Sequence, residues 1–171
     1  MNLRLYCEPD RDGNVHMQRD ADLLAAQRPG DAPVLRLYTW SPPAVSIGCM
    51  QRAEDLLDLE ACRHAGFDVV QRPTGGRAIL HAQEITYAVV APIRDARFGT
   101  DLRATHARIG ECLAAGLAVL GVETSLSRPE LDPERRLLRQ PCFASPGRAE
   151  ILVRGRKLLG SAQRRRAGYI L

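Results

Sequence analysis

Short apolar segments separated by glycine, proline and polar residues constrain this chain more than any other feature of its sequence. Such segments favour strands, and they predict strands over residues 3–7, 34–40, 44–47, 67–71, 78–81, 84–91, 149–153, 157–163 and 168–171. Helical spacing of apolar residues predicts helices over residues 17–27, 53–65 and 101–120. The pattern predicts an α+β fold with a mixed, mostly antiparallel sheet and helices packed on it.

Three details of this pattern make sharper predictions. Residues 78–81 and 84–91 are close together in the chain, and we expect them to pair as a hairpin. The buried stripe of the longest helix is expected to consist of Ile109, Cys112, Leu113, Gly116, Leu117 and Leu120. Residues 125–141 are polar, contain three prolines and are expected to form a long surface loop.

Size and composition predict one soluble domain over residues 1–171. The chain is 45% hydrophobic and 26% charged, which argues against disorder, collagen and coiled coil. No apolar run has the length of a membrane span, and the first residues lack the apolar core of a secretory signal. The five cysteines are widely spaced without a CxxC pair, so we expect no disulfide framework, no metal site and a cytoplasmic location.

The chain carries a net charge of +4, with arginines concentrated in its C-terminal third. A basic surface favours an acidic partner, which by composition alone is a nucleic acid, an anionic ligand or an acidic protein. Aromatic residues make up only 5% of the chain, which argues against a stacking surface for single-stranded nucleic acid. We interpret the run Arg164, Arg165 and Arg166 as the solvated rim of a hairpin rather than a nucleic-acid site.

A glycine pair between two predicted strands is the first candidate site. The segment reads Arg72-Pro73-Thr74-Gly75-Gly76-Arg77-Ala78. Glycines allow backbone amides to approach a ligand closely, and Arg72 and Arg77 would add charge-assisted hydrogen bonds to a carboxylate or phosphate. An ordinary tight turn explains the same residues. The P-loop pattern and its following helix are absent from this sequence.

A lysine followed by small residues is the second candidate site. Gly155-Arg156 is expected to form a hairpin tip, with Lys157 starting the next strand ahead of Gly160, Ser161 and Ala162. Small side chains leave room for a ligand along the strand, where an ammonium group stabilises negative charge on a carbonyl oxygen. A solvated lysine beside a close-packed strand explains these residues equally well.

Two further residues have possible chemical roles. Cys142 lies between a proline and an aromatic residue near many arginines, a setting that favours a reactive thiolate. A lone cysteine is more often a buried apolar residue. His81 ends the strand after the glycine turn, where it would orient a ligand or a thiolate, or serve only as a hydrogen-bonded strand residue.

Taken together, these segments resemble the biotin/lipoate A/B protein ligase superfamily, specifically its lipoate–protein ligase A branch. Residues 72–81 resemble the branch motif R-R-x-[ST]-G-G-[GR]-A-[VI]-x-H-D, with Gln71 in place of the first arginine. Residues 157–163 resemble K-[IV]-x-G-S-A, and residues 40–51 resemble W-x-P-P-x-[VL]-S-x-G-x-x-Q. Residues 17–24 resemble the first family helix more weakly, with His16 in place of an asparagine.

The resemblance implies a fold like that of class II aminoacyl-tRNA synthetases and biotin protein ligases. It also implies that the glycine turn and the lysine strand enclose an acyl group, with Lys157 contacting the acyl carbonyl. The residues that it implies for substrate binding are Arg72, Thr74, Gly75, Gly76, Arg77, His81, Gly160, Ser161 and Ala162.

Cys142 separates the branches of this family. Residues 142–146 resemble the C-F-x-x-P segment of octanoyltransferases that take an octanoyl group from acyl carrier protein as a cysteine thioester. The acceptor there is a lysine of a lipoyl domain or of the glycine cleavage H protein, and no ATP or other cofactor is needed. Acidic carrier and lipoyl proteins would suit the basic surface. The alternatives are an ATP- and magnesium-dependent lipoate–protein ligase, and a noncatalytic domain that binds an acyl group or a carrier protein.

The chain departs from the family pattern at two further places. Ala82 stands where the family usually has an aspartate after the histidine, so a carboxylate that orients His81 would have to come from elsewhere. Residues 168–171 resemble the opening of a further family strand, and the usual continuation is absent. We therefore expect the catalytic domain to be truncated at its C-terminus.

Overall fold

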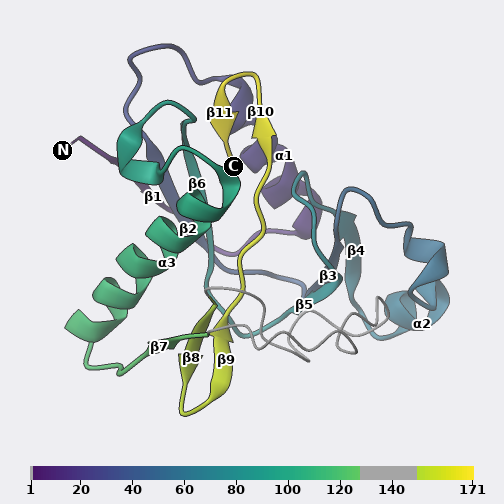
Figure 1. The fold of residues 1–171 in the computed structure, drawn as a ribbon. Coiled ribbons are helices and arrows are strands. Elements are labelled where there is room, and N and C mark those ends of the chain that lie inside the picture. Colours follow the sequence, from purple (N-terminus) through teal and green to yellow (C-terminus); the bar gives the residue numbers. More distant parts are fainter. Residues whose placement is uncertain (1, 128–149) are drawn as a thin grey trace. The chain divides into compact units, whose positions relative to one another are not determined.

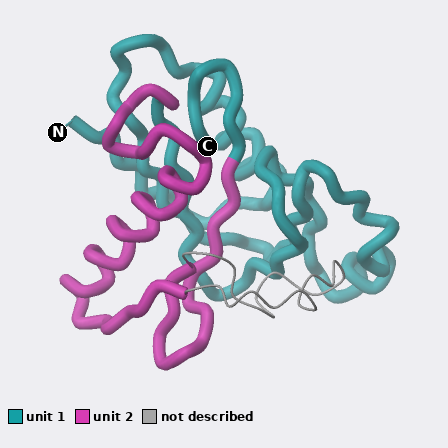
Figure 2. The backbone as a smooth tube through the Cα atoms, in the orientation of Figure 1, with its two compact units in different colours: residues 1–92, 164–171 teal, residues 93–163 magenta. Residues whose placement is uncertain are grey.

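The computed structural model describes residues 2–127 and 150–171. The chain divides into two compact units, which Figure 2 colours separately. Unit 1 consists of Met1–Pro92 and Arg164–Leu171, and unit 2 consists of Ile93–Gln163. The last residues of the chain therefore return to the unit in which the chain begins. Each unit is described by itself, and the prediction of one domain over residues 1–171 stays a prediction.

The larger sheet of unit 1 has the strand order β1-β2-β6-β11-β10 (Figure 1). Its strands are β1 (Arg4–Cys7), β2 (Val34–Tyr38), β6 (Thr86–Pro92), β10 (Arg165–Arg166) and β11 (Tyr169–Ile170). β1 runs parallel to β2, whereas β2 with β6, β6 with β11 and β11 with β10 are antiparallel. The mixed, mostly antiparallel character predicted from the sequence is confirmed.

A smaller sheet of unit 1 has β3 (Ala44–Ile47) between β4 (Asp68–Gln71) and β5 (Ile79–His81). The predicted hairpin of residues 78–81 with 84–91 is wrong. β5 pairs antiparallel with β3, while β6 pairs with β2 in the other sheet. Local sequence identified both segments as strands, but pairing depends on which side chains are buried together, and every residue of β3 is buried.

The helices of unit 1 begin where aspartates cap them. α1 (Gly13–Ala25) starts four residues before the predicted helix, because the Asp12 carboxylate accepts a hydrogen bond from the Val15 amide. The predicted helix over residues 53–65 is wrong as one element. It divides into a 3₁₀ turn, η1 (Ala53–Asp55), and α2 (Leu59–His64), because Asp58 adopts an extended conformation and caps the second helix at Ala61.

The apolar core of unit 1 lies between α1, β2, β3, β4 and β6. Its buried residues are Leu23, Val34, Tyr38, Trp40, Ala44, Val70, Ala88, Val90 and Leu171. Trp40 also stacks on the ring of His81 with centroids 4.1 Å apart. The core therefore ends directly against a predicted site residue.

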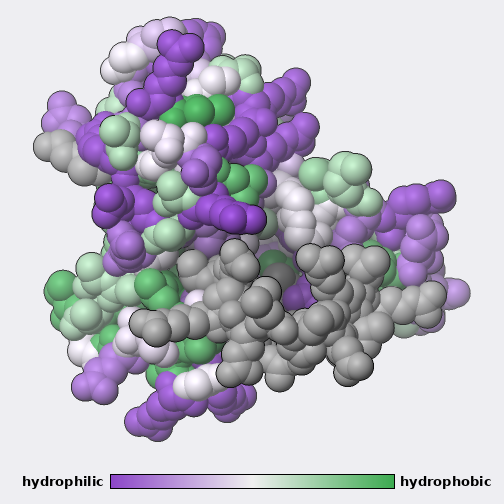
Figure 3. Space-filling view, in the orientation of Figure 1, coloured by the Kyte–Doolittle hydropathy of each residue, from purple (hydrophilic) through white to green (hydrophobic). Residues whose placement is uncertain are grey.

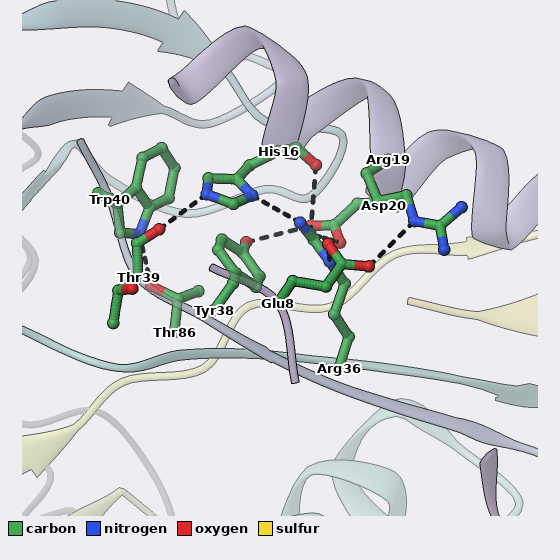
Figure 4. A network of polar contacts seen from close by, with 9 residues as sticks. All are labelled: Glu8, His16, Arg19, Asp20, Arg36, Tyr38, Thr39, Trp40 and Thr86. Carbon is green, nitrogen blue, oxygen red and sulfur yellow. Dashed lines mark hydrogen bonds and ion pairs between the residues drawn. The ribbon is translucent and has the colours of Figure 1, made fainter. Parts of the chain in front are cut away.

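A buried polar network extends from this core along α1 (Figure 4). The fully buried Arg36 guanidinium donates to Glu8 at 2.8 Å and to Asp20 at 2.7 Å, and it lies over the Tyr38 ring. His16 is also fully buried; its Nδ1 lies 2.5 Å from Arg36 Nη2 and its Nε2 lies 2.8 Å from the Thr39 carbonyl oxygen. An arginine only donates hydrogen bonds, so His16 Nδ1 accepts and His16 is neutral.

Unit 2 contains a 3₁₀ turn, a long helix and a small antiparallel sheet. Its elements are η2 (Ala96–Phe98), α3 (Leu102–Val119), β7 (Ser125–Leu126), β8 (Ile151–Val153) and β9 (Arg156–Leu159). β8 pairs antiparallel with both β7 and β9. In the described part of unit 2, the predicted loop over residues 125–141 therefore begins with a strand.

The predicted stripe of α3 is wrong in part. The buried residues of this helix are Thr105 and Gly110, whereas Cys112, Gly116 and Leu120 are exposed. Figure 3 shows hydrophobic surface where Figure 1 places the end of α3 and the β8–β9 hairpin. Among the described residues of unit 2, the large apolar side chains that are exposed are Leu102, Val119, Leu120, Leu126 and Leu158. None of the helices in the described ranges is long and apolar enough to cross a membrane.

Candidate acyl-transfer site

The glycine turn follows β4 and is fixed to neighbouring segments by hydrogen bonds to its backbone carbonyl oxygens. The Cys49 amide donates to the Thr74 carbonyl at 2.9 Å, and the Arg164 guanidinium (Nη1) donates to the Pro73 carbonyl at 2.9 Å. Gly76 has φ of +96°, a conformation that side chains disfavour. This half of the predicted site is therefore a constrained turn whose glycine at position 76 has a conformational reason.

Arg72 stabilises the turn from inside. Its guanidinium donates to the carbonyl oxygens of Gly75 (2.9 Å) and Arg77 (2.7 Å), and to both the carbonyl and hydroxyl oxygens of Ser46. Arg72 is only 8% exposed. The sequence placed Arg72 among the substrate-binding residues; in this structure its hydrogen bonds hold the loop that would bind the substrate. Its direct contact with substrate stays a prediction.

His81 lies at the end of β5 between three polar or aromatic neighbours. Its Nε2 lies 2.7 Å from Ser46 Oγ, its Nδ1 contacts the Glu84 carboxylate, and Trp40 stacks on its ring. A shallow cavity of about 390 Å³ opens beside this group. It is lined by Asp10, Thr39, Trp40, Ala82, Gln83, Glu84 and Ile85.

Lys157 belongs to unit 2, where it is the second residue of β9. The two-residue turn is Arg154-Gly155, with φ of 49° and 74°, so β9 starts at Arg156 and not, as expected, at Lys157. Lys157 Nζ donates to Glu150 Oε1 at 2.7 Å, and these side chains are 3% and 10% exposed. The ammonium group is thus paired with a carboxylate at an almost fully buried position.

Ser127 and His106 are neighbours of the Glu150–Lys157 pair. The backbone of Glu150 is bound on both sides by Ser127, through its hydroxyl at 2.9 Å and its amide at 2.8 Å. The charges of Glu150 and Lys157 both act on the pKa of His106 in α3. Burial lowers the pKa of His106 below its ordinary value of 6.5, Glu150 raises it and Lys157 lowers it, for a net decrease.

Gly160, Ser161 and Ala162 do not continue the strand as predicted, because β9 ends at Leu159. They are half-buried in a segment without regular structure. In the described part of the chain, both amide atoms of Gln163 are buried without a hydrogen-bond partner. Leaving a buried amide unsatisfied typically costs about 1–3 kcal/mol.

The structure brings together Arg72, the glycine turn and His81 in unit 1, and Lys157 with the following small residues in unit 2. Cys142 lies outside the described residues. Sequence reasoning missed Ser46, Glu84 and Glu150. Of these three, only Glu84 was indicated by the sequence, because Ala82 replaces the family aspartate and another carboxylate near His81 was therefore expected. Among residues 2–127 and 150–171, no three His, Cys, Asp or Glu side chains form a group suited to a metal ion.

Comparison with known proteins identifies the family. Residues 12–171 match the lipoyl protein ligase A/B catalytic domain. The chain is 41% identical over 155 residues to octanoyltransferase LipM of Kyrpidia tusciae, covering 89% of this chain and 57% of that protein. It is 42% identical over 174 residues to octanoyltransferase LipM of Symbiobacterium thermophilum, covering 99% of this chain and 63% of that protein. The chain thus spans about 60% of the length of these curated relatives.

Solved structures agree with the predicted fold. A lipoate-protein ligase A bound with ATP superposes with a TM-score of 0.80 at 25% identity, covering 99% of this chain and 64% of that one. A T. acidophilum protein with bound lipoic acid also gives a TM-score of 0.80, at 23% identity over 99% of this chain and 66% of that one, which speaks for the fold alone. The chain belongs to the lipoyl protein ligase A/B catalytic domain family.

Proposed function

We propose that this chain carries the acyl-transfer site of an octanoyltransferase of lipoate assembly. The observation that carries the proposal is the identity of about 40% to octanoyltransferases named LipM, together with Cys142-Phe143 in the segment that distinguishes the cysteine-dependent branch. Cys142 would be the nucleophile, and Lys157 would face the acyl carbonyl. The glycine turn, Gly160, Ser161 and Ala162 would line the acyl chain.

The reaction divides into two balanced steps. The Cys142 thiolate attacks the thioester carbonyl of octanoyl-acyl carrier protein, a new C–S bond forms, and the carrier thiol leaves with the proton that Cys142 released. A lysine amine of a lipoyl domain or of the glycine cleavage H protein then attacks. An amide forms, and the amine proton returns to the Cys142 sulfur. Each step exchanges an activated acyl group, so neither ATP nor a metal is required.

The environment of Lys157 suits a cation that faces the acyl carbonyl better than it suits a general base. Its ammonium group is already hydrogen-bonded to the Glu150 carboxylate at 2.7 Å in a nearly buried position. A carboxylate partner favours the charged lysine, and a charged lysine stabilises an oxyanion. We therefore assign Lys157 as the cation that meets the negative charge developing on the carbonyl oxygen.

The partners follow from this chemistry. Acyl carrier protein and a lipoyl-type acceptor are expected to be acidic, and the chain carries a net charge of +4. We expect neither nucleic acid nor a membrane as a partner. The cytoplasmic location predicted from cysteine usage stays a prediction.

The test is the intact mass of the protein after incubation with octanoyl-acyl carrier protein without ATP. We expect a gain of one octanoyl group, which hydroxylamine removes, and no gain in Cys142→Ala. Labelling that needs ATP and free lipoate and persists in Cys142→Ala would favour the lipoate–protein ligase, whose relative was solved with ATP. Carrier binding without acyl transfer would favour a noncatalytic domain.

A further inference from the structure

We infer that Glu84 is the carboxylate that positions His81 and, through Ser46 and Arg72, the glycine turn. The inference rests on the proposed function for its catalytic consequence, but its structural part concerns only contacts within unit 1. Ala82 occupies the position where the family motif has an aspartate, and Glu84 is two residues further along the same loop. Both residues line the same shallow cavity.

Two chains of hydrogen bonds end at the Glu84 carboxylate. In the first, Trp40 Nε1 donates to Thr86 Oγ1 at 2.7 Å, and Thr86 Oγ1 donates to Glu84 Oε1 at 3.2 Å. In the second, His81 Nδ1 contacts the same carboxylate oxygen. A carboxylate accepts hydrogen bonds, so the contact places a proton on Nδ1 of His81.

Ser46 fixes the other ring nitrogen. Ser46 is fully buried, and its hydroxyl oxygen accepts a hydrogen bond from Arg72 Nη1 at 3.0 Å. Its own proton needs an acceptor, and His81 Nε2 lies 2.7 Å away. A proton on Nε2 would leave the Ser46 hydroxyl with two donors and no acceptor for its own proton. The buried hydroxyl and the carboxylate therefore select the same tautomer of His81, with hydrogen on Nδ1 only.

The tautomer of His81 matters for the glycine turn because Arg72 forms hydrogen bonds with both Ser46 and the turn. The guanidinium that donates to Ser46 also donates to the carbonyl oxygens of Gly75 and Arg77. A change at His81 that displaces the Ser46 hydroxyl would be transmitted to Arg72, which is itself 8% exposed and has little room to adjust. Glu84 is thus a positioning residue: it acts on the acyl-binding turn through three other side chains.

The ring nitrogens of His81 provide a direct test that needs no substrate. In ¹⁵N NMR spectra of the whole chain at neutral pH, we expect the protonated-type shift at Nδ1 and the acceptor-type shift at Nε2. Glu84→Ala leaves only the Ser46 hydroxyl to select this tautomer, so we expect a fraction of the His81 rings to shift their proton to Nε2, and Ala82→Asp in the Glu84→Ala background to restore the wild-type signals. The matched control is Glu54→Ala, an exposed carboxylate that should leave the signals unchanged.

Octanoyl transfer is measured on the same proteins. Glu84→Ala is expected to slow formation of the octanoyl-enzyme by about 10-fold to 100-fold, with recovery in the Ala82→Asp double variant. A wild-type proton found only on Nε2, or a His81 signal unchanged in Glu84→Ala, would overturn the inference. If Glu84→Ala does not fold, the wild-type spectrum alone decides. Tautomer shifts without octanoyl transfer in any variant would instead contradict the proposed function.

Discussion

A methyl group on Gly48 would lie 2.2 Å from the carbonyl oxygen of Gly76, which is closer than packed atoms approach. The atoms it would meet belong to the backbone of the glycine turn, so a flexible side chain cannot relieve the contact. We expect Gly48→Ala to separate the end of β3 from the turn, to weaken the hydrogen bond from Cys49 to Thr74, and to lower the free energy of unfolding by about 2 kcal/mol. Urea unfolding measures this change.

Gly75→Ala is the matched variant. No atom lies within 4 Å of a methyl group at this position, and its φ is outside the left-handed region, so we expect the urea midpoint to remain near that of the wild type. If the turn encloses the acyl chain, this methyl group should nevertheless slow octanoyl-enzyme formation. Normal acylation of Gly75→Ala would contradict the proposed role of the turn, and an unchanged midpoint for Gly48→Ala would contradict the steric argument.

The pair of Lys157 and Glu150 predicts a separation of stability from catalysis. Glu150→Gln leaves the Lys157 ammonium nearly buried without its carboxylate, so we expect the free energy of unfolding to fall by about 3 kcal/mol. The double variant Lys157→Met with Glu150→Leu replaces the ion pair by apolar groups of similar volume, and it should recover most of that loss.

Octanoyl transfer should not recover with stability. The double variant lacks the cation that we place at the acyl carbonyl, so its octanoyl-enzyme should form far more slowly than that of the wild type. Glu111→Gln serves as the control, because its pair with Arg108 is exposed on α3 and should contribute only about 0.5 kcal/mol. Full acylation by the double variant would remove Lys157 from the mechanism.

The strands show what local sequence could predict. β3 has the predicted bounds of residues 44–47, and β2 and β4 lie within theirs, because short alternating runs with turn signals are local properties. Pairing is not local. β5 joined β3 because Ser46 and His81 are buried against each other, a contact that spans 35 residues and leaves no periodic signal. The division of the helix at Asp58 was readable in principle, because aspartate is a strong N-cap.

The candidate site divides in the same way. Its glycine turn and Lys157 could be predicted because they belong to motifs, in which residue types and spacing reflect the chemistry of the site. Glu84 and Glu150 were missed because a supporting carboxylate needs only to lie within hydrogen-bond reach of its partner. Glu150 is seven residues from Lys157 across a hairpin whose bulge at Ile151 and Leu152 shifts the register, so sequence spacing alone does not place the two side chains together.

The buried Arg36 network predicts a large effect from a small change at Asp20. Asp20→Asn removes the charge that pairs with a guanidinium of 0% exposure, and we expect the free energy of unfolding to fall by about 3 kcal/mol. Urea unfolding at neutral pH measures the effect. A loss no larger than that of the exposed Glu111→Gln control would mean that the Arg36–Glu8 pair suffices.

His16 predicts a loss of stability as the pH falls. Burial lowers the pKa of His16 below its ordinary value of 6.5, the Thr39 carbonyl raises it and Arg36 lowers it, for a net decrease. Below about pH 6.5 the unfolded chain therefore binds a proton that the folded chain excludes, and stability falls by up to about 1.4 kcal/mol per pH unit for this residue. His16→Asn supplies an amide to Arg36 and Thr39 without a titrating group, so its urea midpoint should fall less steeply with decreasing pH. His106 remains in both proteins and cancels in the comparison, and equal slopes for the two proteins would contradict a neutral, buried His16.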